Sequence, residues 1–164
     1  MTGPVAGPVI GPVALVPGVP ALLPSYASLE DPVAALRAAS VAAVGRLGPR
    51  VLVRASGPSG ERVAAALVAA AGATVVEAGE SGVLVVGNGS ATRTEKAPGH
   101  LDERAAAFDD ALRSSFAGID AGLAAELWAD TARLGDLPPL SEAEVLYDDA
   151  PFGVQYWVAV WTAS

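Results

Sequence analysis

Short apolar runs alternate along this chain with longer stretches in which apolar residues recur at helical spacing, and turn residues separate the two. The apolar runs predict strands over residues 12–16, 50–54, 73–77 and 83–86. The longer stretches predict helices over residues 29–47, 61–71, 102–116 and 123–134. Parallel strands need long crossover connections, so this alternation predicts an α/β fold in which helices cover a mostly parallel central sheet.

The last part of the chain adds two β-like runs, at residues 144–147 and 153–162, with an Asp-Asp-Ala-Pro turn between them. Alternation along the second run places Val154, Tyr156, Val158 and Val160 on one face, and Gln155, Trp157, Ala159 and Trp161 on the other. No linker interrupts residues 12–164, which we therefore predict to be a single domain. Residues 1–11 predict a flexible Gly/Pro-rich lead-in, because their prolines lack the backbone donors that a central strand needs.

The chain contains one histidine, His100, and no cysteine. A thiol nucleophile is therefore excluded, and one histidine is too few for a metal triad of two histidines and a carboxylate. These counts lead us to expect no cofactor. The absence of cysteine also fits a cytoplasmic protein, which has no use for a disulfide framework.

Charge and hydropathy narrow the range of partners. Ten basic and eighteen acidic residues give a formal net charge of −8, which argues against a nucleic-acid or anionic-membrane surface. No apolar stretch reaches the roughly 18 residues of a membrane span. Residues 1–23 lack a basic start and contain several prolines, so we expect no signal peptide.

A glycine-rich loop follows the apolar run at 83–86. Ligands of open α/β sheets bind at the carboxyl ends of strands, and glycines let backbone N–H groups approach an anion. We predict a ligand-binding loop formed by Gly87, Asn88, Gly89, Ser90, Arg93 and Lys96. The alternative is a tight turn and a loop solvated by its charges. The turn at residues 56–60 is a second candidate site, because it leads into a helix whose N-terminus could bind an anion. The alternative is an ordinary helix start with an N-cap residue.

Carboxylates near the end of the chain are candidate metal ligands. Glu144, Asp148 and Asp149 carry the hard oxygen atoms that divalent cations prefer, although acids in turns commonly accept local backbone hydrogen bonds instead. His100 is the candidate catalytic base, because histidine titrates near neutral pH. Its alternative role is that of a capping or surface residue at a helix start.

Three segments, residues 14–24, 84–112 and 146–161, together resemble a group of short, alanine-rich proteins. That group is related to the catalytic B-subunit of class III extradiol ring-cleavage dioxygenases. The motifs that carry the resemblance are Gly-Asn-Gly-Ser, Lys-Ala-Pro-Gly, Leu-Asp-Glu-Arg and Tyr-Asp-Asp-Ala-Pro. The resemblance implies a three-layer α/β sandwich. In true enzymes of the family, two histidines and a glutamate hold Fe(II), and a further histidine serves as acid and base while O₂ opens a catechol ring.

The resemblance also implies that this chain has lost the reaction. The related group has Val-Pro-His-Pro after its first strand, with a histidine that looks like the family's first metal ligand, whereas this chain has Gly18 there. The second metal histidine and the acid/base histidine have no counterpart among residues 48–82. Our leading hypothesis is a catalytically degenerate relative without Fe(II) that binds a small molecule or has a structural role.

Two alternatives stay open. In the first, the chain is a divergent metal-dependent enzyme acting on catecholic compounds. Its Fe(II) or other divalent metal would be held by His100 with Glu144, Asp148 or Asp149, a set that suits Mg²⁺, Mn²⁺ or Ca²⁺ better than oxygenase iron. In the second, the chain is a homo-oligomeric interaction protein. Aromatic residues are enriched at interfaces, and five of the nine lie near the end of the chain: Tyr147, Phe152, Tyr156, Trp157 and Trp161.

Overall fold

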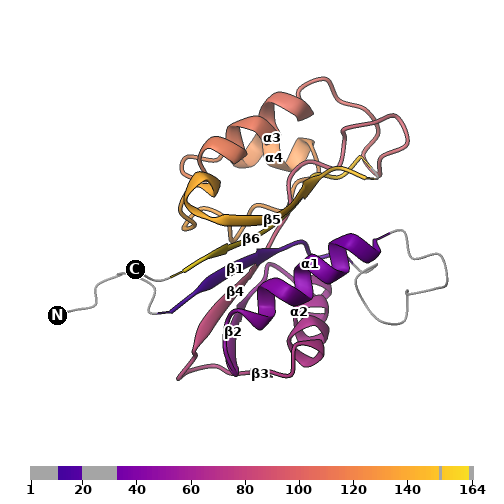
Figure 1. Cartoon of the computed structure of the whole chain (residues 1–164). Coiled ribbons are helices and arrows are strands. Elements are labelled where there is room, and N and C mark those ends of the chain that lie inside the picture. Colours follow the sequence, from indigo (N-terminus) through magenta and orange to yellow (C-terminus); the bar gives the residue numbers. More distant parts are fainter. Residues whose placement is uncertain (1–10, 20–32, 152, 163–164) are drawn as a thin grey trace.

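A six-stranded mixed sheet, in the order β3-β2-β4-β1-β6-β5, forms the centre of the protein (Figure 1). The computed structural model describes residues 11–19, 33–151 and 153–162. The strands are β1 (Val13–Val16), β2 (Arg50–Arg54), β3 (Thr74–Val75), β4 (Gly82–Val86), β5 (Glu144–Asp149) and β6 (Tyr156–Trp161). The helices are α1 (Ala34–Gly45), α2 (Pro58–Ala70), α3 (Ala105–Ser114) and α4 (Ala121–Glu126), with a 3₁₀ turn, η3, at Leu140–Glu142. The chain therefore has the predicted α/β architecture.

The sheet has a parallel part and an antiparallel part. Strands β1, β2, β3 and β4 pair in parallel, and β1 and β4 keep continuous register from Val13↔Val83 to Val16↔Val86. Strand β6 runs antiparallel to both β1 and β5. Only antiparallel strands can be joined by a short hairpin, which is why the few residues between β5 and β6 reverse the chain there.

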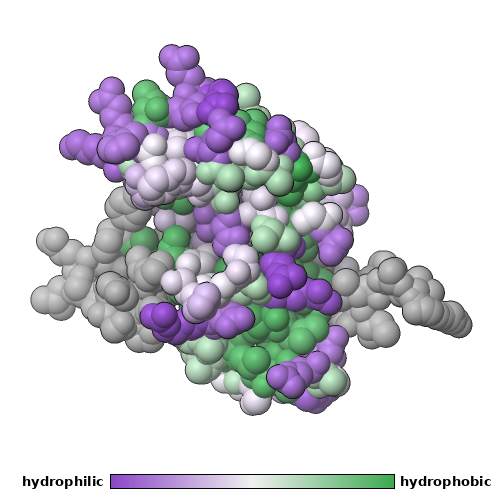
Figure 2. Space-filling view, turned by 180° about the vertical axis from the view of Figure 1, so that it is seen from behind, coloured by the Kyte–Doolittle hydropathy of each residue, from purple (hydrophilic) through white to green (hydrophobic). Residues whose placement is uncertain are grey.

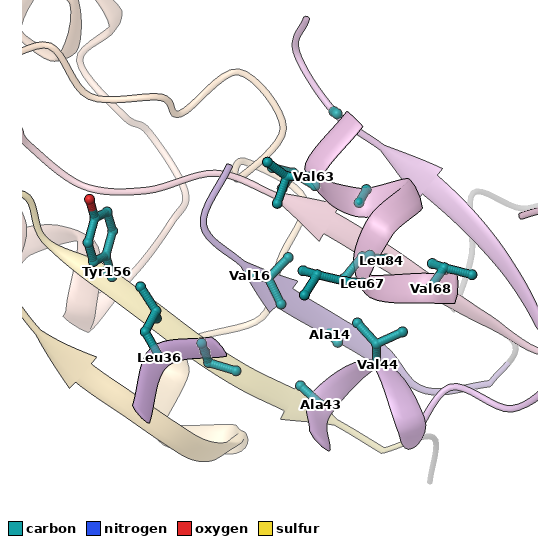
Figure 3. Packing of buried hydrophobic residues seen from close by; sticks show 14 of the residues in the cluster. Ala14, Val16, Leu36, Ala43, Val44, Val63, Leu67, Val68, Leu84 and Tyr156 are labelled. Carbon is teal, nitrogen blue, oxygen red and sulfur yellow. The ribbon is translucent and has the colours of Figure 1, made fainter. Parts of the chain in front are cut away.

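Helices α1 and α2 cover one face of the sheet. Their buried side chains, among them Leu36, Val44 and Leu67, pack against alternate strand residues that include Val16 and Leu84 (Figure 3). Leu36 and Val44 recur at helical spacing along α1, and Val63, Leu67 and Val68 do the same along α2. Alternate strand residues point to one face, so each strand supplies every second side chain to this core.

The opposite face of the sheet packs against α3, α4 and the segment around η3. Leu15, Val85 and Trp157 point to this side and contact a second cluster that includes Phe108 and Leu134. The predicted alternation of the last strand is confirmed. Tyr156, Val158 and Val160 belong to the first cluster, and Trp157, Ala159 and Trp161 to the second.

The predicted helix over residues 123–134 is wrong in its extent, because the helix that forms there is α4, Ala121–Glu126. Trp128 takes a left-handed conformation with φ of 60°, which ends the helix. Asp130 then pairs with Asn88 in an isolated antiparallel bridge. A tertiary contact therefore recruits a segment whose apolar spacing alone favours a helix.

Other boundaries differ by smaller amounts. Strand β3 has only two residues instead of five, because the chain turns after pairing with β2 to bring the Gly79 carbonyl within 2.6 Å of Arg50 Nε. Helix α2 starts three residues before the predicted position, with a proline in its first turn. Helix α3 is shorter than residues 102–116. The predicted lead-in, except Gly11, and the predicted helix start at 29–32 lie outside the described residues.

The predicted turn at Asp148 and Asp149 is also wrong, because both residues belong to β5. They pair with Trp157 and Tyr156 across the hairpin, after a bulge between Val145 and Tyr147. Backbone pairing with β6 extends the strand beyond its apolar residues.

No helix in the described ranges is long and apolar enough to cross a membrane. In the view from behind, hydrophobic residues gather on the lower half of the molecule (Figure 2), the half in which Figure 1 places β2 and β3. Leu52, on the face of β2 that points toward the α3 side, is only partly buried there.

Candidate functional site

The carboxyl ends of β1, β2 and β4 meet at one edge of the sheet, because these strands are parallel. Open α/β sheets bind their ligands at this edge. The loop of Gly87, Asn88, Gly89 and Ser90 leaves β4 there, as predicted. Ser56 leaves β2 nearby and donates a hydrogen bond of 2.8 Å to Asp130 Oδ1. Asn88 and Asp130 exchange two backbone hydrogen bonds of 3.0 Å.

Every backbone N–H group of this loop already donates a hydrogen bond to an oxygen atom of the protein. Gly87 donates to the Val16 carbonyl, Asn88 to Asp130 and Gly89 to Gln155, at 2.9 to 3.0 Å. Ser90 N–H donates to the Asp109 carboxylate at 2.8 Å. A loop that cradles an anion needs N–H groups that are free to turn toward it. This loop instead uses them to join β1, the residue before β6, α3 and the segment after α4.

The two glycines of the loop allow close packing. A Cβ atom at Gly87 would lie 2.7 Å from Leu134 Cδ2 and 2.8 Å from the Asp130 carbonyl oxygen. A Cβ atom at Gly89 would lie 2.6 Å from Asp109 Oδ1 and 2.9 Å from Gln155 Cβ. A glycine-rich loop of this kind serves backbone approach between elements, which is the other physical use of glycine.

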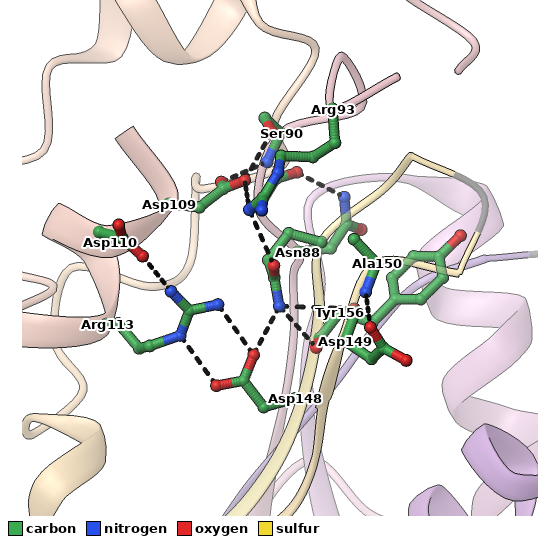
Figure 4. Close-up of polar contacts among 12 residues, drawn as sticks. Asn88, Ser90, Arg93, Asp109, Asp110, Arg113, Asp148, Asp149, Ala150 and Tyr156 are labelled. Carbon is green, nitrogen blue, oxygen red and sulfur yellow. Dashed lines mark hydrogen bonds and ion pairs between the residues drawn. The ribbon is translucent and has the colours of Figure 1, made fainter. Parts of the chain in front are cut away.

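Asp109 is the centre of a buried polar network (Figure 4). Its side chain is fully buried, and its carboxylate accepts hydrogen bonds from Ser90 N–H at 2.8 Å and from Ser90 Oγ at 2.7 Å. Arg93 Nη1 lies 3.2 Å from the same carboxylate and also donates to Gln155 Oε1 at 3.2 Å. A buried carboxylate needs such partners, because an unpaired charge in the interior is very costly.

The network continues from Gln155 to the end of β5. Gln155 Nε2 donates to Asp148 Oδ1 at 2.7 Å, and Arg113 Nε and Nη2 hold both Asp148 oxygens at 2.8 and 2.9 Å. Arg113 also pairs with Asp110, and its guanidinium carbon lies 5.7 Å from the centre of the Trp157 ring. The Asp148 carboxylate raises the pKa of Arg113 further, so this cation stays charged. The network therefore ties α3 to the β5–β6 hairpin.

The candidate metal ligands do not converge. Glu144 pairs with Arg46 at 3.1 Å, Asp148 is held by Arg113 and Gln155, and Asp149 accepts the N–H of Ala150 at 2.8 Å. Within residues 11–19, 33–151 and 153–162, no three side chains of the His, Cys, Asp and Glu types are placed to hold a metal ion.

The predicted loop residues divide between two places. Ser90 and Arg93 belong to the buried network, whereas Lys96 lies exposed in the loop that leads to α3. His100 lies in the same loop, five residues before α3, so it does not cap the helix. The His100 ring is exposed, and its Nδ1 lies 3.4 Å from the Glu95 carbonyl oxygen.

Among the network residues that sequence reasoning missed as site residues, Asp109 and Gln155 are the buried ones, whereas Arg113 is partly exposed. Asp109 falls on the buried stripe of α3 with Ala105, Phe108 and Leu112, so an acid at an apolar-face position is the signal that identifies it. Gln155 is assigned to the face of the last strand that carries two tryptophans, and this polar residue among aromatic neighbours is a comparable signal. Both side chains are at most 1% exposed.

The sequence resembles a family that binds iron, and Gly18 lies where that resemblance would place the first iron-ligating histidine. The packing around Gly18 therefore shows whether such a histidine would fit. A Cβ atom at this position would lie 2.8 Å from Val86 Cγ1 and 3.4 Å from the Gly60 Cα atom. A larger side chain at position 18 therefore needs the Val86 side chain to shift, whereas the Gly60 Cα atom lies at an ordinary contact distance. With the candidate carboxylates dispersed as well, the described residues do not fit a site of two histidines and a glutamate.

Two tyrosines lie at the same edge of the sheet, on the α1 side. Tyr156 begins β6 and is 4% exposed, and Tyr147 packs against the same cluster from β5. The pKa of Tyr156 is raised to about 12, mainly by burial and to a smaller extent by the nearby Tyr147. Burial also raises the pKa of Tyr147. Both phenols therefore remain neutral at physiological pH.

The shift at Tyr156 predicts a loss of stability at alkaline pH. Its pKa rises from 10.0 to about 12 on folding, so the contribution is complete below pH 10 and is lost as pH rises toward 12. We expect the free energy of unfolding to fall across this window, and to fall less steeply in Tyr156→Phe. Urea unfolding at several pH values measures the slope. Equal slopes in the two proteins would contradict the assignment.

Comparison with models of known protein families, with curated proteins and with solved structures finds no match in any of the three.

Proposed function

We propose that this protein is a non-catalytic member of the three-layer α/β sandwiches to which class III extradiol dioxygenase B-subunits belong, and that it binds or organises other molecules in the cytoplasm. The observation that carries the proposal is the packing at Gly18, where the resemblance would place a metal-ligating histidine. Val86 and Gly60 fill the space in front of this residue. A histidine at this position would therefore need the Val86 side chain to move.

The dispersal of the other polar groups supports the same proposal. Ring cleavage by these enzymes needs two histidines and a carboxylate on one metal, and a further histidine as acid and base. Here His100 lies in an exposed loop, and Asp148 is held by Arg113 and Gln155. Breaking that arrangement to free Asp148 for a metal would leave a partly buried Arg113 without its main partner.

Metal analysis of protein purified without oxygen tests the proposal. We expect far less than one iron per chain, with or without added Fe(II), and no ring-cleavage product from catechol. The physical reason is the missing donor set. A His100→Ala variant serves as the control, and its iron content should equal that of the parent protein.

About one iron per chain together with catechol cleavage, both lost in His100→Ala, would overturn the proposal in favour of a divergent enzyme. Metal without cleavage is distinguished by titration with Mg²⁺, Mn²⁺ and Ca²⁺. A rise in Tm that depends on the concentration of one of these ions would identify a carboxylate site and contradict the metal-free part of the proposal.

Four of the five aromatic residues near the end of the chain are buried or partly buried, which does not favour them as a surface for self-association. Trp157 is fully buried, Trp161 and Tyr156 are at most 6% exposed, and Tyr147 is partly buried. Phe152 lies outside the described residues. The four described side chains contribute to the two core clusters.

A further inference from the structure

Trp128 occupies a position that the fold would fill better with glycine. It directly follows the C-cap of α4, where Trp128 N–H donates to the Ala125 carbonyl at 3.2 Å and Ala129 N–H to the Ala124 carbonyl at 2.9 Å. This pair of bonds is a Schellman motif, whose left-handed residue is usually glycine. Trp128 adopts φ of 60° there.

Burial does not compensate for this strained backbone. The Trp128 side chain is 59% exposed, whereas the other two tryptophans of the chain belong to the core. A strained conformation at a mostly exposed aromatic residue points to a role outside folding, because more than half of its surface makes no contact with the fold. Tryptophan is also the residue type most enriched among the residues that dominate binding energy at interfaces.

A second residue with a left-handed backbone lies in the loop that adjoins Trp128. His100, with φ of 61°, is the other non-glycine residue of positive φ in the described part of the chain. Gly99 connects the two features, because a Cβ atom there would lie 3.1 Å from Trp128 Cγ. Leu101, the residue after His100, is 53% exposed. Two of the four large hydrophobic residues exposed in the described ranges therefore belong to two adjoining segments.

The charges around this surface are mainly negative. Glu95 and Glu103 are exposed and lie on the same loop as His100 and Leu101, and Glu126 lies two residues before Trp128. Arg104 is already held by Asp102 at 2.8 Å and by Glu126 at 3.0 Å. Between Glu95 and Glu126, the lysines and arginines that are exposed and outside the buried network are Arg104 and Lys96. Acidic side chains therefore outnumber lysine and arginine in the two segments that carry Leu101 and Trp128, and this balance favours a cationic ligand.

We propose that Trp128, His100 and Leu101 form a docking surface for a lysine- or arginine-rich peptide segment of a partner protein. The ammonium or guanidinium group lies over the face of Trp128, and the carboxylates of Glu95, Glu103 and Glu126 attract the remaining charges. Charge complementarity selects this occupant over a second copy of the chain, because each copy carries a net charge of −8. The surface uses none of the residues that pack around Gly18, and it does not depend on the absence of metal there.

Fluorescein-labelled hexalysine and hexaarginine peptides test the surface by fluorescence anisotropy, with hexaglutamate as the negative probe. We expect binding to the full chain at low salt, weakening as salt rises, and at least about tenfold weaker binding in Trp128→Ala. Val145→Ala is the matched control, because Val145 is 42% exposed on a different element. Its affinity should equal that of the parent protein. Equal affinity in Trp128→Ala would overturn the proposal.

The fold itself gives a second readout. Trp128→Gly relieves the left-handed strain, so we expect its Tm to stay unchanged or to rise by about 2–4 °C while peptide binding is lost. A fall in Tm would assign Trp128 a structural role and overturn the proposal. Analytical sedimentation of the parent protein and of Trp128→Ala measures the oligomeric state as a third test. A dimer that Trp128→Ala abolishes, together with no peptide binding, would assign the surface to self-association instead.

Discussion

Replacing Asp109 by alanine is expected to lower the free energy of unfolding by about 3–5 kcal/mol, because the substitution removes one partner of a buried charged pair. The carboxylate accepts three hydrogen bonds, from Ser90 N–H, Ser90 Oγ and Arg93. All three donors would remain, and the two from Ser90 would be buried without an acceptor. Urea unfolding followed by circular dichroism measures the change, provided that the slope with urea is unaltered.

The neighbouring acid is the matched control for this prediction. Asp110 lies on the same helix, but its side chain is 71% exposed and pairs with Arg113 at the surface. We expect Asp110→Ala to change stability by less than about 1 kcal/mol. Asp109→Asn should lie between the two variants, because the amide keeps one acceptor for Ser90. A loss of under about 1 kcal/mol in Asp109→Ala would show that the network contributes little to the fold.

Replacing Gly89 by alanine is expected to cost about 2–3 kcal/mol through overpacking. The new methyl group would lie 2.6 Å from Asp109 Oδ1, 2.9 Å from Gln155 Cβ and 3.0 Å from Trp157 Cη2. Neither the backbone of the loop nor the fully buried Trp157 ring can withdraw without breaking other contacts. Thermal and urea unfolding both measure the effect.

Gly45→Ala is the control for the methyl group itself. Gly45 ends α1, and a Cβ atom there meets nothing within 4 Å. Alanine has the higher helix propensity, so this variant should be unchanged or more stable by up to about 1 kcal/mol. A Gly89→Ala protein as stable as the parent would mean that the loop relaxes freely. That result would favour the prediction that the loop at residues 87–90 binds a ligand.

The Gly-Asn-Gly-Ser loop shows how far local pattern carries. Its position after a buried strand, at the edge where α/β sheets bind ligands, was predictable because strand and turn signals are local. The use of its N–H groups was not, because their acceptors come from residues as distant as Val16 and Gln155. A sequence window cannot distinguish glycines that admit an anion from glycines that admit another backbone.

Helix ends likewise depend partly on local spacing, which the sequence shows, and partly on long-range contacts, which it does not. The spacing of apolar residues predicted α1 and α2 well, because their length and burial follow one periodic stripe. The segment after α4 carries a similar spacing, but Asn88 and Ala91 bind its backbone at Asp130 and Leu127. These long-range hydrogen bonds outweigh a helix propensity that is worth only fractions of a kcal/mol per residue.

The sequence by itself determined the α/β class, the two faces of the last strand and the shortage of histidine and cysteine as metal ligands. Each of these follows from residue type, count or local period. Tertiary structure alone decided that Ser90, Arg93, Asp109 and Gln155 meet in one network, that Val86 closes the space beside Gly18, and that Trp128 stays exposed. Such features depend on which distant side chains share a volume, and close packing settles that only when the whole chain has folded.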